Sequence, residues 1–209
     1  MRVGVDIGGT FTDIVMSKDG VLTIHKLPTT SQDPSVAMLD GMITITQDRL
    51  SELEWVAHGT TVATNAILQR NGGRIAFITT HGFRDMLFIG RQNRPDLYAL
   101  APTLPAPIIP REACYEVIER LDHTGQVIKP LDSASLNDVL DALSQHLYDA
   151  VAVCLLYSYI NPDHERRIAE KIIQKGIFAP HQIILSHQVL SEFREYERAS
   201  TTALEAFVR

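Results

Sequence analysis

Alternating apolar and polar residues open the chain and predict three antiparallel strands. The apolar runs Val3–Ile7 and Ile14–Met16 flank a turn that contains Gly8-Gly9, and a third run follows at Val21–Leu27. Lys18-Asp19-Gly20 separates the second run from the third. Period-two alternation with β-branched residues is typical of strands, and short connections with glycine are typical of hairpins. We therefore expect a three-strand antiparallel meander at the start of the chain.

Helix patterns alternate with short apolar strands in the rest of the chain. Asp33 and Pro34 predict the N-cap and first turn of a helix whose apolar face carries Val36, Leu39 and Ile43. Strands linked by helices favour parallel pairing in an α/β sheet. The other expected elements are strands at 55–59, 74–79, 151–156 and 181–186, a helix at 60–68 closed by Asn71-Gly72-Gly73, a hairpin of 115–121 with 126–131, a helix from Asp132 or Ser133 to Leu147, a helix from Pro162 to Gly176, and a helix that begins near Ser191.

A proline-rich segment interrupts this alternation between residues 90 and 113. A long loop inside a compact domain is usually functional or mobile. Arg91 and Arg94, at its start, are therefore candidates for binding a substrate or a phosphate, and the alternative is that they are solvated surface arginines. Just before the loop, Arg84 and Asp85 are expected to pair with each other. The prolines of the segment are Pro95, Pro102, Pro105, Pro107 and Pro110.

Composition and charge narrow the class of protein. The chain has 209 residues, 45% of them hydrophobic, and a net charge of -6, without a basic run. This charge argues against a nucleic-acid partner, because such proteins neutralise phosphates with lysine and arginine. No apolar segment approaches the roughly 18 residues of a membrane span. Cys114 and Cys154 lie far apart, and we expect both to be structural free thiols of a cytoplasmic protein.

The turn after the first strand carries residue types that bind phosphate. We expect Gly8 and Gly9 to adopt positive φ and to let backbone N–H groups approach an anion. Threonine hydroxyls donate hydrogen bonds, and carboxylates bind Mg²⁺ or orient a water beside a phosphoryl group. An ordinary structural hairpin is the alternative. The candidates are Asp6, Gly8, Gly9, Thr10, Thr12 and Asp13.

A second candidate cluster lies where the strand at 55–59 meets the following helix. His58, Thr60, Thr61 and Asn65 fall around the expected helix N-terminus, which suits an anionic or polarised oxygen. The alternative is that the threonines cap the helix and that His58 is a satisfied core histidine. Both interpretations stay open on the sequence alone.

Motif searches exclude several other kinds of site. The sequence has no Walker-type phosphate loop, no dinucleotide fingerprint, no histidine or cysteine spacing typical of zinc, and no Gly-x-Ser-x-Gly elbow. A meander followed by helix-linked strands instead favours an α/β, ribonuclease-H-like lobe of the actin, sugar-kinase and heat-shock ATPase type. In such a lobe we expect a mixed sheet with helices on both faces.

Five motifs resemble the N-terminal region of the hydantoinase A/5-oxoprolinase family, which includes β subunits of acetone and acetophenone carboxylases. The resemblance covers essentially the whole chain, in the order of the family. The opening motif is shared with sugar kinases, and the five together are specific to the family. They are Val5–Asp13, His58–Ala66, Thr79–Asp85, Ile89–Gln92 and Glu192–Arg198.

The resemblance implies ATP and Mg²⁺ as cofactors and a cyclic amide or ketone as the substrate, whose carbonyl is phosphorylated before hydrolysis or carboxylation. It implies catalytic roles for Asp6 and Asp13, with Asp6 as the metal ligand. Phosphate binding falls to Gly8, Gly9, Thr10 and Thr12, and substrate binding to His58, Thr60, Thr61, Asn65 and Arg91.

The resemblance also predicts how the chain is organised. Residues 1–185 correspond to the N-terminal ATPase lobe, and residues 186–209 to the start of a truncated hydantoinase A domain. The final helix has no stop signal, so we expect a piece of a longer polypeptide that is inactive by itself. The expected partners are the remaining domains and a hydantoinase B-type subunit. The alternatives are a sugar-type kinase lobe and a nucleotide-binding assembly module without catalysis.

Overall fold

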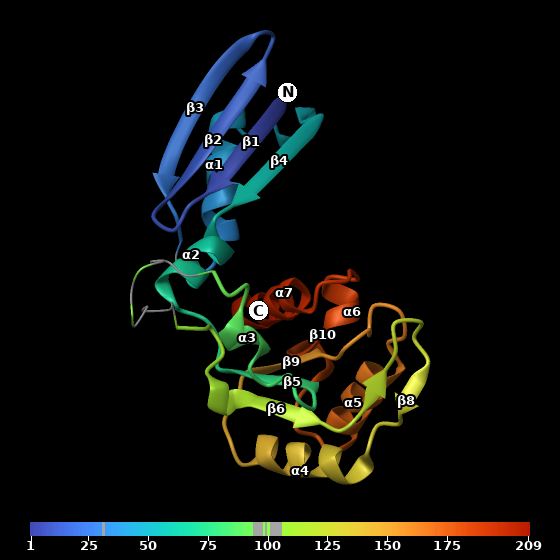
Figure 1. The fold of residues 1–209 in the computed structure, drawn as a ribbon. Coiled ribbons are helices and arrows are strands. Elements are labelled where there is room, and N and C mark those ends of the chain that lie inside the picture. The colour runs from blue at the N-terminus through green and yellow to red at the C-terminus, as the bar shows by residue number, and fades with distance from the viewer. Residues whose placement is uncertain (31, 94–97, 99, 101–105) are drawn as a thin grey trace. The chain divides into compact units, whose positions relative to one another are not determined.

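The predicted meander is present in the computed structural model, which describes residues 1–30, 32–93, 98, 100 and 106–209 (Figure 1). Strands β1 (Arg2–Ile7), β2 (Phe11–Lys18) and β3 (Val21–Pro28) pair antiparallel in chain order. The β2–β3 turn places Asp19 and Gly20 at φ 50° and 80°. Two consecutive positive φ values match the right-handed twist of a two-residue hairpin, which explains the Asp-Gly pair.

A parallel strand turns the meander into a mixed sheet. Strand β4 (Trp55–Thr60) pairs parallel with β1 and gives the order β3-β2-β1-β4. Helix α1 (Pro34–Thr46) and the 3₁₀ turn η1 (Leu50–Glu52) connect β3 to β4, and helix α2 (Val62–Gln69) follows β4. These elements form the first of two compact units, residues 1–71.

Helix α1 begins as predicted but packs through a different face. Asp33 caps it by accepting a hydrogen bond from the Ser35 backbone N–H at 3.0 Å. The predicted face is wrong, because the side chains it was built on remain 40–53% exposed: Val36, Leu39 and Ile43. The buried positions are instead Ala37, Gly41, Met42, Ile45 and Thr46. Small residues at two of these positions let the helix approach the sheet closely, and spacing alone does not reveal that choice.

Gly41 is the point of closest approach between α1 and the sheet. A Cβ there would lie 2.9 Å from Leu27 Cδ2 and closer still to Ile14 Cδ1, which is fully buried. Alanine favours a helix over glycine by about 1 kcal/mol, whereas overpacking costs about 1–3 kcal/mol. We expect Gly41→Ala to lower the free energy of unfolding by about 1 kcal/mol in urea titrations. Asp40→Ala, at an exposed position of the same helix, is the control. Equal stability of Gly41→Ala and the wild type would contradict the close packing of α1 on the sheet at Gly41.

The second unit, residues 72–209, is built on a four-stranded parallel sheet. Its order is β10-β9-β5-β6, and helices cover both faces (Figure 1). The strands are β5 (Ile75–Thr80), β6 (Cys114–Val117), β9 (Ala150–Cys154) and β10 (Ile183–Leu185), with a separate hairpin of β7 (Arg120–Leu121) and β8 (Val127–Lys129). The helices are α3 (Met86–Ile89), α4 (Ser133–Ser144), α5 (Asp163–Gln174), α6 (Ser186–Val189) and α7 (Glu195–Val208), with 3₁₀ turns η2 (Arg111–Ala113) and η3 (Pro180–Gln182).

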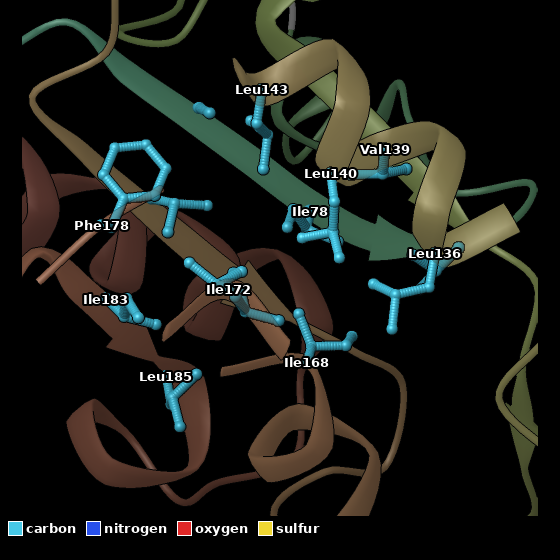
Figure 2. Close-up of a cluster of buried hydrophobic side chains, with 14 of the residues drawn as sticks. Ile78, Leu136, Val139, Leu140, Leu143, Ile168, Ile172, Phe178, Ile183 and Leu185 are labelled. Atoms are coloured by element: carbon cyan, nitrogen blue, oxygen red, sulfur yellow. The ribbon is translucent and has the colours of Figure 1, made fainter. Parts of the chain in front are cut away.

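The main hydrophobic core lies between this sheet and helices α4 and α5 (Figure 2). Leu140 and Leu143 from α4 meet Ile78 of β5, and Ile168 and Ile172 from α5 complete the cluster. Helix α7 packs on β9 and β5 through the buried side chains Ala199, Ala203, Ala206 and Phe207. None of the helices in the described ranges is long and apolar enough to cross a bilayer.

Several expected boundaries of the second unit differ from the structure, and the strand expected at 181–186 is reduced to β10 (Ile183–Leu185). The predicted hairpin strand at 115–121 is divided, because β6 joins the parallel sheet and only β7 pairs with β8. Leu147 lies beyond the end of α4 and is 84% exposed, so the helical repeat stops one turn early. Helix α7 starts at Glu195, later than the expected Ser191.

Both cysteines are buried free thiols, as predicted. Burial raises the pKa of Cys114 to about 11 and that of Cys154 to about 12. A thiol is nucleophilic only as the thiolate, and both side chains are therefore protonated and inert near neutral pH.

Candidate functional site

The β1–β2 turn is tight for a different reason than the sequence suggested. The Gly8 N–H donates to the Phe11 carbonyl at 2.9 Å and closes the turn. The predicted positive φ is wrong, since neither Gly8 nor Gly9 is among the residues of positive φ. These two positions need glycine instead because a larger side chain would lack space. A Cβ on Gly8 would lie 3.0 Å from the Phe11 carbonyl oxygen, and one on Gly9 would lie 3.3 Å from Asn65 Nδ2.

Two consecutive amides at the tip of this turn are open. In the described part of the chain, no acceptor is recorded for the backbone N–H of Gly9 or Thr10. Thr10 is exposed, so its hydroxyl adds a third accessible donor. Successive unpaired N–H groups in a turn form an anion-binding concavity.

Thr12 and Thr29 brace the turn from its buried side. Thr29 Oγ1 donates to the Gly8 carbonyl at 2.9 Å, and its backbone N–H donates to the Thr10 carbonyl at 2.9 Å. Thr12 is fully buried, and its hydroxyl lies 3.0 Å from Thr29 Oγ1. Since the Thr29 proton is used on Gly8, Thr12 is the donor of that pair. The sequence reasoning missed Thr29, because a threonine after the last strand residue gives no distinguishing signal.

The two candidate carboxylates face each other across the β1–β2 ladder and differ in their partners. Asp6 is paired with Asp13 in the strand register. Lys26 Nζ lies 2.7 and 2.8 Å from the two carboxylate oxygens of Asp13. Asp6 is exposed, and no hydrogen bond or ion pair to its carboxylate occurs within the described residues. Asp6 is therefore the carboxylate that is available to a ligand.

The β4–α2 junction lies against the same turn. The Thr61 N–H and the Thr60 hydroxyl both donate to the Ile7 carbonyl, at 3.1 and 3.3 Å. The Thr60 hydroxyl also accepts from the Val62 N–H, whereas Thr61 makes no side-chain cap. Asn65 Nδ2 donates to Thr61 Oγ1 at 3.3 Å, and the same amide adjoins Gly9. The structure thus brings Thr60, Thr61 and Asn65 together with the turn.

His58 lies apart from this grouping, and Arg91 belongs to the second unit. His58 pairs with Val5 in the β1–β4 register, one residue out of step with Asp6, so it lies on the opposite face of the sheet. It is exposed, and its interpretation as a core histidine is therefore wrong. Arg91, in the second unit, pairs with Glu197 at 2.9 Å and thereby lowers the pKa of that carboxyl. The predicted candidate Arg94 lies outside the described residues, as do Pro95, Pro102 and Pro105.

The predicted pair of Arg84 with Asp85 is wrong. Asp85 pairs with Arg111, which lowers the pKa of the Asp85 carboxyl. Arg84 donates from Nε and Nη2 to the Arg111 backbone carbonyl, at 3.3 and 3.2 Å. The two adjacent side chains therefore do not pair with each other, and each binds a different group of Arg111, on the segment that leads into β6.

A buried polar network in the second unit was also missed. Glu165 accepts hydrogen bonds from the Leu155 N–H at 3.0 Å, from Ser186 Oγ at 2.6 Å and from the His187 N–H at 3.2 Å. His164 Nδ1 lies 2.7 Å from Glu119 Oε2, with both side chains buried. Glu165 thereby links the turn after β9 to the residues that follow β10.

Comparison with known proteins identifies the family. Residues 2–176 match the model of the hydantoinase/oxoprolinase N-terminal region. The chain belongs to this family. The match begins at β1 and ends after α5, so it includes the open turn, the β4–α2 junction and most of the parallel sheet. The predicted boundary between domains at residue 185 stays a prediction.

Relatives and a solved structure extend the comparison. The acetophenone carboxylase gamma subunit of Aromatoleum aromaticum is 35% identical over 99% of this chain and 31% of its own length. The motif resemblance names a β subunit of acetophenone carboxylase, whereas the matched relative is the gamma subunit. The 5-oxoprolinase 1 of Arabidopsis thaliana is 32% identical over 100% of this chain and 19% of its own length. The chain thus spans less than a third of each relative.

The nucleotide-free structure of acetone carboxylase, from work on ATP-dependent acetone carboxylation, superimposes with a TM-score of 0.88. At 24% identity, it covers 99% of this chain and 32% of its own. This similarity confirms the predicted fold class, an α/β lobe of the ribonuclease-H-like kind.

Proposed function

We propose that the turn Gly8–Thr10 binds the terminal phosphates of ATP. The observation that carries the proposal is the pair of open N–H groups on Gly9 and Thr10 beside the exposed Thr10 hydroxyl. Donors fixed before the reaction stabilise the charge that develops on a transferring phosphoryl group. Thr12 acts here through Thr29 rather than by touching phosphate, because its hydroxyl is buried.

Magnesium fits this site as an ion that accompanies the nucleotide. The described ranges contain no group of three histidine, cysteine, aspartate or glutamate side chains that could hold a metal by themselves. Mg²⁺ typically takes one or two carboxylates together with waters and substrate phosphates. We assign Asp6 as that carboxylate, while Asp13 supports the turn through Lys26. When bound, the ion would neutralise charge on the phosphates.

The reaction we propose is activation of the carbonyl of a cyclic amide or ketone by ATP, followed by hydrolysis or carboxylation. The names of the relatives support these two outcomes. Thr61 and Asn65 adjoin the phosphate turn and are assigned to the carbonyl oxygen that receives the phosphoryl group, through the Thr61 hydroxyl and the second amide hydrogen of Asn65. Thr60 is assigned to positioning the turn, because its hydroxyl proton is already donated to the Ile7 carbonyl. Roles for His58 and Arg91 stay predictions from the sequence.

We further propose that the activity needs more than these 209 residues. The matched relatives include proteins named as subunits. A hydantoinase B-type subunit and further domains of the polypeptide are the partners that we infer, in a cytoplasmic enzyme. The β1–β2 turn offers two open amides, the Thr10 hydroxyl and the Asp6 carboxylate, which are a small part of the contacts that ATP needs.

The test measures ADP release by the full-length natural protein with its co-purified subunits. The candidate substrates are 5-oxoproline, hydantoin, acetone and acetophenone, and glycerol and glucose serve as kinase substrates. We expect at least one amide or ketone to stimulate ADP release, and the 209-residue chain alone to give no substrate-dependent release. Stimulation by a sugar alone, or by none of the compounds, would contradict the proposal.

A further inference from the structure

The second unit contains a cavity that none of these assignments uses. Its volume is about 650 Å³, within the range of small-molecule pockets. The turns after β5 and β9 contribute Phe83, Tyr157 and Tyr159, and the start of α7 contributes Tyr196. The cavity therefore lies at the carboxyl edge of the parallel sheet, where ligands of open α/β sheets bind.

The charges on the cavity wall are unbalanced. Its two acids are already paired, Asp85 with Arg111 and Glu195 with Arg198 at 3.9 Å. Its two arginines lie against aromatic rings instead. The guanidinium of Arg120 lies 5.3 Å from the centroid of the Phe83 ring, and that of Arg194 lies 5.5 Å from the Phe193 ring. No carboxylate pairs with either arginine in the ranges that the structure describes.

Two strained residues shape this wall. Tyr157 and Arg194 adopt φ of 58° and 77°, in the left-handed region that bulky side chains rarely occupy. Strain of this kind persists only where surrounding contacts enforce it, and it clusters at ligand sites. Buried Arg198 supplies such contacts next to Tyr157, because it donates to the Leu155 carbonyl at 2.8 Å and to Ser158 Oγ at 2.5 Å.

We propose that this cavity binds the carboxylate of a small organic acid through Arg120 and Arg194, with the aromatic side chains against its carbon skeleton. Guanidinium groups bind carboxylates by paired hydrogen bonds, and rings already hold both arginines in place. The aromatic lining favours a carbon-bearing ligand over inorganic phosphate. The proposal rests on the proposed function in one respect, since hydrolysis of a cyclic amide and carboxylation of a ketone both yield a carboxylate.

The experiment titrates the full-length natural protein, without nucleotide, with cyclohexanecarboxylate, cyclohexanecarboxamide and inorganic phosphate by calorimetry. We expect the affinity for the carboxylate to be at least about tenfold higher than the affinity for its neutral amide. Arg120→Gln and Arg194→Gln should each weaken carboxylate binding by about tenfold, whereas Arg166→Gln, on the exposed face of α5, should leave it unchanged. Melting curves check that each variant folds, and Arg120→Lys should restore part of the affinity.

Three outcomes would overturn this assignment. They are equal affinity for the carboxylate and the amide, unchanged affinity in both glutamine variants, and tighter binding of phosphate than of the carboxylate. Absence of binding by all three probes would also count against it. Because the titration contains no ATP, its failure leaves the proposed phosphate site untouched, and failure of the ADP-release assay leaves the carboxylate site untouched.

Discussion

Replacing Gly9 by valine is expected to lower substrate-dependent ADP release by the full-length protein about 10²–10³-fold, the usual effect of removing one charge-stabilising donor. A Cβ on Gly9 would lie 3.3 Å from Asn65 Nδ2, so the branched side chain has to displace either this amide or the turn. Either displacement moves the N–H groups of Gly9 and Thr10 away from the positions proposed for phosphate. The measurement is the steady-state rate of ADP release.

Gly4→Val is the matched control for this prediction. Gly4 lies on the same strand, β1, and a Cβ added there would have nothing within 4 Å. Valine also suits a strand better than glycine does. The control should retain the wild-type rate within about twofold, as expected of a surface change away from special features. If Gly9→Val kept the wild-type rate as well, the turn would have no role in catalysis.

Replacing Arg198 by methionine is expected to lower the free energy of unfolding of the second unit by about 3 kcal/mol, the scale of breaking a buried charged network. Arg198 is fully buried and donates to the Leu155 carbonyl and to Ser158 Oγ. Its guanidinium also lies 5.2 Å from the centroid of the Tyr159 ring. Methionine keeps the apolar stem of the side chain but removes the donor to the Leu155 carbonyl and leaves Ser158 Oγ with Ser186 Oγ as its partner. Urea unfolding followed by circular dichroism measures the loss.

The competing effect is relief from burying a charge. Arg198 has one carboxylate partner among the described residues, Glu195 at 3.9 Å, and Nε of Arg198 has no partner there. An apolar replacement of a poorly paired buried charge is sometimes neutral. We expect a net loss of stability for Arg198→Met, because the two hydrogen bonds of Arg198 fix the turn after β9. Arg166→Met, on the exposed face of α5, should change stability by less than about 0.5 kcal/mol, and an equally stable Arg198→Met would refute this account.

The strands and most helices were predictable because their patterns depend on local periodicity. The β1–β2–β3 meander follows from alternation, and α4 follows from apolar residues spaced at three and four. Helix α1 shows the limit of prediction from local periodicity. Its larger apolar side chains suggested one face, but Gly41 and Ala37 allow closer contact on another. Which side of a helix packs depends on the surface opposite, and that surface is absent from a local pattern.

The candidate site was predictable where the residue type restricts the backbone. The glycine and threonine motifs marked both the β1–β2 turn and the β4–α2 junction, but no spacing indicated that the two would adjoin, and Gly8 and Gly9 are required for space and not for positive φ. The buried network around Glu165 and Arg198 was not predictable, because charged residues are normally exposed and several of their partners, such as Ser186 for Glu165 and Leu155 for Arg198, lie more than twenty residues away.

Hydrogen–deuterium exchange at single-residue resolution tests the central claim most directly. The full-length natural protein is compared with and without MgATP, and the amides of Gly9 and Thr10 are followed individually. We predict that both amides exchange more slowly with the nucleotide bound, because each then donates to a phosphate oxygen, while the Gly8 amide, already bonded to the Phe11 carbonyl, changes little. Nucleotide binding that leaves the exchange of Gly9 and Thr10 unchanged would contradict the claim that this turn holds the phosphates.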